Sequence, residues 1–381
     1  MDFSLSAEQR ELTEAAAAFA RRELNQDLAK REDAREFPQE AWRACAKFGI
    51  QGLPVPAEMG GAGADVLTMI LVMEALGYGC QDNGLLFSLN AQMWSVEMPL
   101  VTFGTADQQQ AYLPGMISGD IIGGHAMTEP DSGSDALSMR TRAERRSDLY
   151  LLNGTKQYIT NAPVANVFLV YASVQGCPGL AGISAFLVDA ATPGIQVSGS
   201  VEKMGLRTSP MGEIALTDCL VPAASRLGPE GAGMAIFNSS MEWERSCMLA
   251  SAVGAMRRQL DTCVAYARSR EQFGRPIGQF QGVAASLADM YVRLEAARLL
   301  IYRVAWLKQQ GRSAPAEAAA AKLFTSEAWV RSSQDAIQTH GALGYLKEAG
   351  IERDLRDAVA STIYSGTSEI LRVILARMLG L

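Results

Sequence analysis

The sequence predicts an α+β fold in which a region of strands lies between two helical regions. Ala- and Leu-rich stretches with helical spacing occupy residues 1–120, and long amphipathic stretches return over residues 229–381. Between them, residues 121–228 hold short apolar runs separated by Gly and Pro. No Gly-x-Gly-x-x-Gly turn leads from a strand into a helix, which argues against a dinucleotide-binding unit of alternating strands and helices. We therefore expect an N-terminal helical domain, a central antiparallel β domain and a C-terminal four-helix bundle with these boundaries.

Helix signals begin at the N-terminus. Ser6 is placed to cap a helix that runs through Ala-rich sequence to Leu28, and Pro38 opens a second helix that continues to Phe48. The Pro- and Gly-rich segment 49–63 is typical of a loop. Further helical patterns cover residues 66–77 and 93–103 and the surroundings of Pro114.

Strand signals dominate the central region. Apolar runs predict strands over residues 149–152, 158–160, 167–174, 183–188 and 213–220. The Asn153-Gly154 pair that follows the first of these runs predicts a tight hairpin turn.

Four amphipathic stretches predict the helices of the C-terminal region. They cover residues 237–270, 280–310, 314–340 and 368–379. His340 ends the third stretch before a Gly, where a ring nitrogen can pair with the last carbonyls of a helix, so we interpret it as structural. His125 precedes a strand, and the sequence leaves open whether it faces a ligand or fills a polar pocket.

Composition and charge exclude several functional classes. The 381 residues carry a net charge of -7, from 34 Lys and Arg against 41 Asp and Glu, so we expect no nucleic-acid-binding surface. The longest apolar runs are too short to span a bilayer, and no signal peptide is visible. Six scattered cysteines and two histidines predict neither a disulfide frame nor a metal site, and they fit a reducing cytoplasm.

Four strings of residues carry a resemblance to a known family. They are 127–135 (Met-Thr-Glu-Pro-Asp-Ser-Gly-Ser-Asp), 153–161 (Asn-Gly-Thr-Lys-Gln-Tyr-Ile-Thr-Asn), 268–277 (Arg-Ser-Arg-Glu-Gln-Phe-Gly-Arg-Pro-Ile) and 364–367 (Tyr-Ser-Gly-Thr). Taken singly, each string is explained by a purely structural feature, such as a polar turn, a hairpin or a solvated charge. In this order and spacing, they resemble the acyl-CoA dehydrogenase family over essentially the whole chain. The resemblance implies the family's fold and an FAD cofactor. It also implies thioester dehydrogenation, in which a base removes the α-proton while the β-hydrogen leaves as hydride to flavin N5.

The resemblance also implies which residues hold the cofactor. Those expected around the flavin ring are Met127, Thr128, Gly133, Ser134, Tyr158 and Thr160, with Ser134 also near the acyl chain. Those expected at the pyrophosphate, partly supplied by a neighbouring subunit, are Arg270, Gln272, Phe273 and Gln281. Those expected on the adenosine side are Gln338, Gly341 and Thr367. Cofactor sites shared between subunits imply a homo-oligomer, and the family favours a homotetramer.

The candidate base departs from the commonest family pattern. Many members place a Glu in a Tyr-Glu-Gly-Thr string, where this chain has Ser365, and a Ser hydroxyl cannot by itself deprotonate an α-carbon. A second family location, a Glu before an Arg early in the helix after the β domain, corresponds to Glu244. A carboxylate next to Trp243 and the apolar run after it would have a raised pKa, as a base working near neutral pH requires.

Other residues near Glu244 are weaker candidates for a catalytic role. Glu242 is the alternative base, but helical geometry turns it to a different face. The alternative interpretation is that Glu244 is one more charge at the start of a helix, where the helix dipole favours a carboxylate. We expect Arg245 to orient the site and Tyr364 and Ser365 to lie on the substrate side. We expect Ser365→Ala to reduce activity little.

The pairing of Ser365 with Trp243-Glu244-Arg245 resembles a subgroup of natural-product pathways that oxidises acyl or aminoacyl groups on carrier proteins. Prolyl-carrier-protein dehydrogenases, which convert a prolyl to a pyrrolyl thioester, are the nearest. The string 203–208 reads like the common acyl-CoA enzymes, so a CoA thioester of fatty-acid or branched-chain catabolism stays an alternative. A flavin monooxygenase or oxidase and a catalytically dead flavin-binding scaffold are further alternatives, although Glu244 weighs against the last. Either an electron-transfer flavoprotein or oxygen would serve as electron acceptor.

Overall fold

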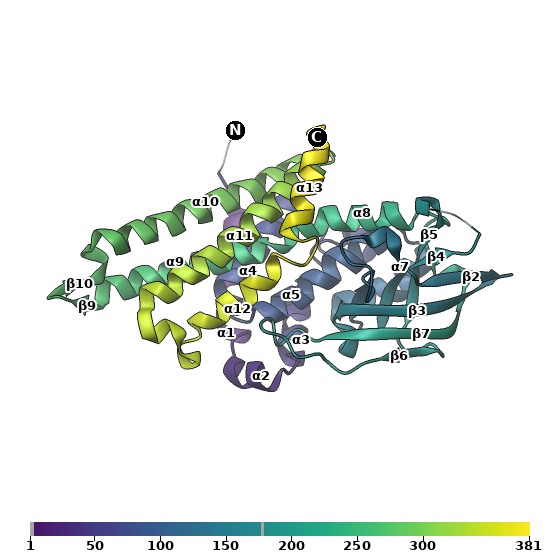
Figure 1. Ribbon diagram of the computed structural model, residues 1–381, viewed down its shortest axis with the longest axis horizontal. Helices are drawn as coiled ribbons and strands as arrows, with labels where there is room; N and C mark the ends of the chain where they lie inside the picture. Colours follow the sequence, from purple (N-terminus) through teal and green to yellow (C-terminus); the bar gives the residue numbers. More distant parts are fainter. Residues whose placement is uncertain (1–3, 177–178) are drawn as a thin grey trace.

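The computed structural model describes residues 4–176 and 179–381, and it divides into a helical body and a sheet-containing body (Figure 1). The helices of the N-terminal part are α1 (Ala7–Glu23), α2 (Leu28–Ala34), α3 (Gln39–Phe48), α4 (Val66–Gly79), α5 (Asn83–Gln92), α6 (Met98–Phe103) and α7 (Ala106–Ser118). Ser6 caps α1 as predicted, because its hydroxyl accepts from the Gln9 amide while the Gln9 side chain accepts from the Ser6 amide. A π-helical turn, Met93–Glu97, links α5 to α6.

The central part forms one mixed sheet. Its strands are β1 (Gly123–Ala126), β2 (Arg142–Arg146), β3 (Leu149–Thr160), β4 (Val167–Val174), β5 (Ile183–Asp189), β6 (Ile195–Val197), β7 (Met211–Pro222) and β8 (Arg226–Leu227). They follow the order β6-β7-β3-β2-β4-β5-β8, and β1 pairs with β4. The predicted antiparallel pairing is present. It joins β3 to β2 and to β7, and it joins β5 to β4 and to β8. However, β4 runs parallel to both β1 and β2.

The predicted hairpin at Asn153-Gly154 is wrong. These residues lie inside β3, which runs unbroken for 12 residues, and the chain reverses earlier, between β2 and β3. The register with β7 shifts between Leu152 and Gly154, so the pair marks a β-bulge. Gly is needed here because a Cβ at residue 154 would lie 2.4 Å from the Thr141 hydroxyl oxygen.

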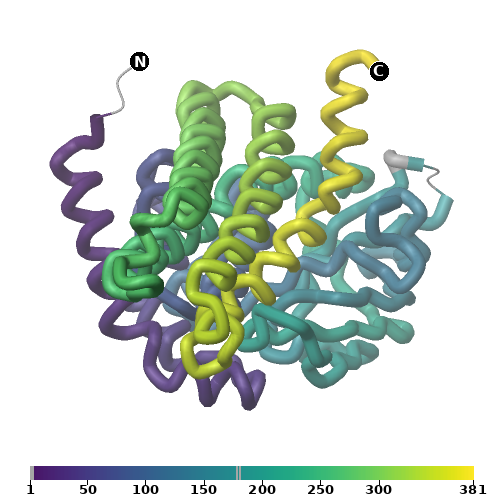
Figure 2. The backbone as a smooth tube through the Cα atoms, turned by 60° about the vertical axis from the view of Figure 1, so that its left-hand side comes forward, coloured from purple at the N-terminus to yellow at the C-terminus, as the bar shows by residue number. Residues whose placement is uncertain are grey.

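The C-terminal part is helical, as predicted. It contains α8 (Gly233–Trp243), α9 (Ala250–Ser269), α10 (Gln281–Gln309), α11 (Pro315–His340), α12 (Ile351–Ser361) and α13 (Ser368–Met378), with the two-stranded hairpin β9 (Glu271–Gln272) and β10 (Arg275–Pro276). A second π-helical turn, Glu244–Met248, joins α8 to α9. The long helices α9, α10 and α11 lie side by side, and α13 projects from the body beside them (Figures 1 and 2).

The two helical parts share a single hydrophobic core, although the sheet separates them in the sequence. Helix α4 lies directly against α9, and two glycines permit the contact. A Cβ at Gly77 would lie 1.9 Å from the Ser251 carbonyl oxygen, and one at Gly254 would lie 2.0 Å from the Glu74 carbonyl oxygen. This close packing brings the π-helical turn before α9 against the one after α5.

Residues 4–176 and 179–381 contain neither a helix suited to cross a membrane nor a cluster suited to hold a metal ion. No described helix combines the length and apolar character needed to cross a membrane. No group of three or more His, Cys, Asp or Glu within these residues is arranged to hold a metal ion. Five cysteines (Cys45, Cys80, Cys219, Cys247 and Cys263) are free and buried, and Cys177 lies outside the described residues.

Candidate functional site

Glu244 lies in the second π-helical turn with its carboxylate held between two hydroxyls. The residue is only 7% exposed. Ser95 donates to one carboxylate oxygen at 2.6 Å, and Ser365 donates to the other at 2.5 Å. Burial raises the pKa of Glu244, and the two hydroxyl hydrogen bonds and Arg245 partly oppose that rise. No cation of the described residues lies within ion-pair distance of its oxygens, and a buried carboxylate with a raised pKa suits proton abstraction near neutral pH.

Two facing π-helical turns produce this arrangement. Ser95 belongs to the first turn and Glu244 to the second. Beside them, the rings of Trp94 and Trp243 stack with their centroids 6.1 Å apart. A π-helical turn shifts the register of a helix, so it can aim a side chain where regular α-helical spacing would not.

The segment 364–367 approaches Glu244 from the other side and is fixed by two cationic side chains. Arg245 donates from Nε to the Ser365 carbonyl oxygen at 3.0 Å, and Lys322 donates from Nζ to the Gly366 carbonyl oxygen at 2.7 Å. Ser365 has a left-handed φ of 55°. The direct contact of Ser365 with Glu244 revises the expectation that Ser365→Ala has little effect.

Glu242, the alternative base, faces away from this group. Its carboxylate pairs with Lys308 at 2.8 Å and accepts from the Ser313 hydroxyl and the Ala314 amide. Burial acts to raise its pKa, but Lys308 and these donors outweigh burial and lower it. The helical-geometry argument against Glu242 therefore agrees with the structure.

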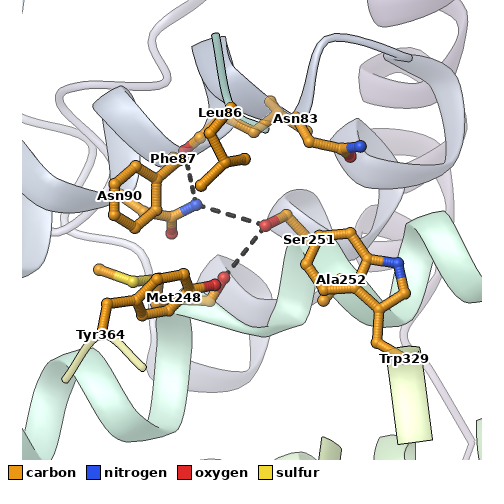
Figure 3. Close-up of a pocket in the computed structure, with 10 residues that line it drawn as sticks. Asn83, Leu86, Phe87, Asn90, Met248, Ser251, Ala252, Trp329 and Tyr364 are labelled. Carbon is orange, nitrogen blue, oxygen red and sulfur yellow. Dashed lines mark hydrogen bonds between the residues drawn. The ribbon is translucent and has the colours of Figure 1, made fainter. Parts of the chain in front are cut away.

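A small pocket lies beside the Glu244 turn (Figure 3). Its lining residues are Asn83, Leu86, Phe87, Asn90, Leu206, Met248, Ser251, Ala252, Trp329 and Tyr364. The rings of Phe87 and Tyr364 lie 4.7 Å apart, and Asn90 donates to the Ser251 hydroxyl at 3.4 Å. Ser365, which follows Tyr364, also borders this pocket through Met248, since its hydroxyl lies 3.9 Å from the Met248 sulfur.

The residues expected around a flavin ring gather at the ends of β1 and β3. The Gln157 amide donates to the Thr128 carbonyl at 2.9 Å, which sets Met127 and Thr128 beside Tyr158. Tyr158 has a left-handed φ of 59° and is 58% exposed. Gly133 and Ser134 lie in the exposed loop after β1.

The side chains at these strand ends fit a flavin. The hydroxyls of Thr128, Ser134 and Thr160 have no hydrogen-bond partner among the described residues, and each of the three residues is at least partly exposed. An isoalloxazine ring presents nitrogen and oxygen atoms along one edge and an apolar face. The free hydroxyls match the polar edge of the flavin, and the exposed aromatic ring of Tyr158 matches its apolar face.

A buried ion pair supports the loop that carries these residues. Lys156 donates to the Met127 carbonyl at 3.1 Å and to Glu129 at 2.8 Å. Glu129 in turn accepts from the backbone amides of Arg140 and Thr141. Burial lowers the pKa of Lys156 to about 8, although Glu129 acts to raise it. Both ends of the loop 129–141 are thereby tied to β3.

Contacts through α5 connect the strand ends with the Glu244 group. Asn161, directly after β3, donates to the Ser88 carbonyl at 3.2 Å and to the Gly123 carbonyl at 3.3 Å. Phe87, next to Ser88, packs against the ring of Tyr364 in a tilted arrangement. The flavin-edge residues and the candidate base are therefore linked through a single helix.

The remaining predicted cofactor residues lie elsewhere in the chain. The hairpin β9–β10 carries Gln272 and Phe273, at the end of the molecule far from the sheet (Figure 1). Arg270 directly precedes this hairpin at the end of α9, and Gln281 follows it at the start of α10. Phe273 is 92% exposed. Gln338 and Gly341 are exposed at the end of α11, and Thr367 caps α13. Within one chain, the hairpin residues therefore lie away from the flavin residues at the ends of β1 and β3.

Both histidines have structural contacts. His340 hydrogen-bonds the Ala336 carbonyl at 2.8 Å and stacks on Tyr266, as the helix-end interpretation predicts. His125 lies 3.3 Å from the Tyr171 hydroxyl and stacks with Phe237. Burial and the nearby Lys156 lower the pKa of His125 to about 3, so it stays neutral.

Three features of the site escaped the sequence reasoning: Ser95, Lys322 and the Lys156–Glu129 pair. Ser95 lies in a stretch with an ordinary helical pattern, and nothing in that pattern marks a π-helical turn. Lys156 and Glu129 do fall within the two strings that resemble the flavin signature, which was the one available signal.

Comparison with known proteins places these features in a family context. Models of the acyl-CoA dehydrogenase N-terminal, middle and C-terminal domains match residues 6–120, 124–219 and 231–380. An L-prolyl-[peptidyl-carrier protein] dehydrogenase of Serratia sp. is 42% identical over 100% of this chain and 99% of its own length.

Two solved structures are also similar to this chain. The prolyl acyl carrier protein oxidase AnaB has a TM-score of 0.98 and 47% identity, over 99% of this chain and 100% of its own. PigA with FAD and proline has a TM-score of 0.97 and 42% identity, over 100% of both chains.

Proposed function

Because this chain belongs to the acyl-CoA dehydrogenase family, we propose that it is an FAD-dependent dehydrogenase of a carrier-protein-bound acyl or aminoacyl thioester. A prolyl thioester of natural-product biosynthesis is the substrate we favour, since relatives named for that activity match the full chain. The observation that carries the proposal is the buried Glu244 carboxylate, bonded to the Ser that stands in the Tyr-Ser-Gly-Thr string.

In this proposal the chain's residues bind, orient and deprotonate the substrate. Glu244 removes the α-proton onto its carboxylate, while Ser95 and Ser365 stabilise the charged form that must exist before the transfer. Arg245, Tyr364 and Ser365 border the substrate, together with Ser134 at the strand ends. When bound, FAD would supply the hydride acceptor.

The cofactor contacts we propose fall into three sets. The flavin set is Met127, Thr128, Gly133, Ser134, Tyr158 and Thr160. The pyrophosphate set is Arg270, Gln272, Phe273 and Gln281, and the adenosine set is Gln338, Gly341 and Thr367. Because the flavin and pyrophosphate sets lie apart in one chain, a neighbouring subunit would complete each site.

We further propose a homotetramer. Large apolar side chains are exposed along α10, namely Tyr291, Val292, Leu299 and Trp306. Analytical ultracentrifugation should find four chains, and Phe273→Ala should lower the flavin content if Phe273 contributes to a neighbour's site. A monomer that retains full flavin content would contradict this proposal.

The substrate proposal is tested by mixing the oxidised flavoprotein, without oxygen, with prolyl-loaded carrier protein and with a panel of acyl-CoAs. We expect the flavin absorbance to bleach with the prolyl-loaded carrier and not with the acyl-CoAs. Empty carrier protein is the control. Bleaching only by an acyl-CoA would instead assign the chain to fatty-acid or branched-chain catabolism.

Two further outcomes separate the remaining alternatives. No bleaching by any thioester would favour a flavin-binding scaffold without this activity. If bleaching occurs, admitting air measures how fast the reduced flavin reacts with oxygen. Fast reoxidation would identify oxygen as acceptor, and slow reoxidation would point to an electron-transfer flavoprotein.

A further inference from the structure

Lys322 is a buried cation that the proposed reaction does not use. It lies in the N-terminal half of α11 and is 1% exposed. Its ammonium donates to the Gly366 carbonyl oxygen at 2.7 Å and lies 5.8 Å from the centre of the Tyr364 ring. The charged groups around it are Glu244 and Arg245 of the second π-helical turn, Glu327 of α11 and Glu369 of α13.

We propose that Lys322 is a positioning residue for the base, because its bond to Gly366 holds the Ser365 hydroxyl against the Glu244 carboxylate. The inference rests on the proposed function of Glu244. It assigns to Lys322 an effect on catalysis that passes through Ser365, without contact between Lys322 and the reacting atoms.

The backbone of the segment 364–367 explains why such an anchor is needed. Ser365 has φ of 55° and Gly366 has φ of 96°, so two successive residues are left-handed. A Ser in this region is strained and stays there only when its surroundings fix it. Arg245 fixes the Ser365 carbonyl and Lys322 fixes the next one. Two cations therefore hold two consecutive carbonyls of the turn that presents the Ser365 hydroxyl.

The burial of Lys322 means that its contact with the Gly366 carbonyl is kept at a cost in hydration free energy. An ammonium loses favourable hydration when it leaves water, and a carbonyl oxygen returns only part of it. Burial, together with Arg245, lowers the pKa of Lys322 to about 7. An apolar side chain at this place in α11 would avoid that cost but would leave the Gly366 carbonyl without its donor.

The test is the pH dependence of anaerobic flavin reduction by the best substrate of the panel. Lys322→Met should move the acid limb of the pH–rate profile upward by about one pH unit and so slow reduction about tenfold at pH values below the limb. Both follow because Glu244 loses a hydrogen bond to its charged form. Ser365→Ala should move the limb in the same direction. Lys347→Met, at an exposed lysine paired with Asp33, should leave rate and limb unchanged.

The double variant separates positioning from a simple charge effect. If Lys322 acts through Ser365, adding Lys322→Met to Ser365→Ala should change the limb little beyond Ser365→Ala alone. Full additivity, or an unchanged limb in Lys322→Met with full flavin content, would overturn the proposal. If the Met variant does not bind flavin, Lys322→Ala, which also removes the donor to the Gly366 carbonyl, is judged by the same criteria. Flavin reduction that survives Glu244→Gln would instead refute the function of Glu244 itself.

Discussion

Replacing Glu244 by Gln should slow substrate-driven flavin reduction by about 10²–10⁴-fold, the range that a positioned general base contributes. Gln keeps the size of the side chain and can accept from one of the Ser95 and Ser365 hydroxyls while its NH2 group donates to the other, but it cannot take up the α-proton. Because Glu244 does not belong to the proposed flavin set, flavin content should stay that of the wild type. Anaerobic stopped-flow absorbance measures the rate, and the spectrum of the purified variant measures the flavin.

Glu242→Gln is the matched control for this variant. Glu242 lies two residues away and pairs with Lys308 on another face. We expect this variant to retain the rate within a few-fold. If the two variants exchanged these results, Glu242 would be the base, and if both retained the rate, neither would be.

Replacing Lys156 by Met should destabilise the protein by about 3–5 kcal/mol, as expected when one partner of a buried ion pair is removed. Lys156 and Glu129 are both buried, and the variant leaves the Glu129 carboxylate without its cation. It also removes the donor to the Met127 carbonyl, so the flavin should bind more weakly. Denaturant-induced unfolding measures the first effect, and flavin retention after gel filtration measures the second.

The exposed Lys347 again provides the comparison. Its ion pair with Asp33 lies in water, and Lys347→Met should change neither unfolding nor flavin retention. Wild-type stability and full flavin retention in Lys156→Met would contradict the supporting role of the ion pair. Loss of stability with unchanged flavin affinity would mean that the ion pair stabilises the fold but does not support flavin binding.

Local patterns predicted the order of the regions because apolar periodicity and turn residues are properties of short segments. Ser6 and Pro38 began helices where expected. Asn153-Gly154 misled because its propensity favours a hairpin, while pairing on both sides with β2 and β7 keeps β3 continuous through the β-bulge at this pair. Tertiary pairing overrode a local signal there.

The candidate base was identified from the sequence, but its surroundings were not. Glu244 followed from the resemblance to a second family location of the base, a Glu before an Arg, and from the apolar residues near it. Its partners Ser95 and Ser365 are 149 and 121 residues away, and two π-helical turns bring the first of them close. Such contacts depend on how helices pack, which no window of the sequence contains. The same reason explains why Lys322 was not singled out.

We propose that this chain dehydrogenates a carrier-bound aminoacyl thioester with Glu244 as the base. The most direct test is the intact mass of prolyl-loaded carrier protein after incubation with the wild-type enzyme and with Glu244→Gln. We predict that the carrier-bound group loses hydrogen with the wild type and keeps its mass with the variant. An unchanged carrier with the wild type, under conditions in which an acyl-CoA is oxidised, would contradict the claim, as would equal hydrogen loss with both enzymes.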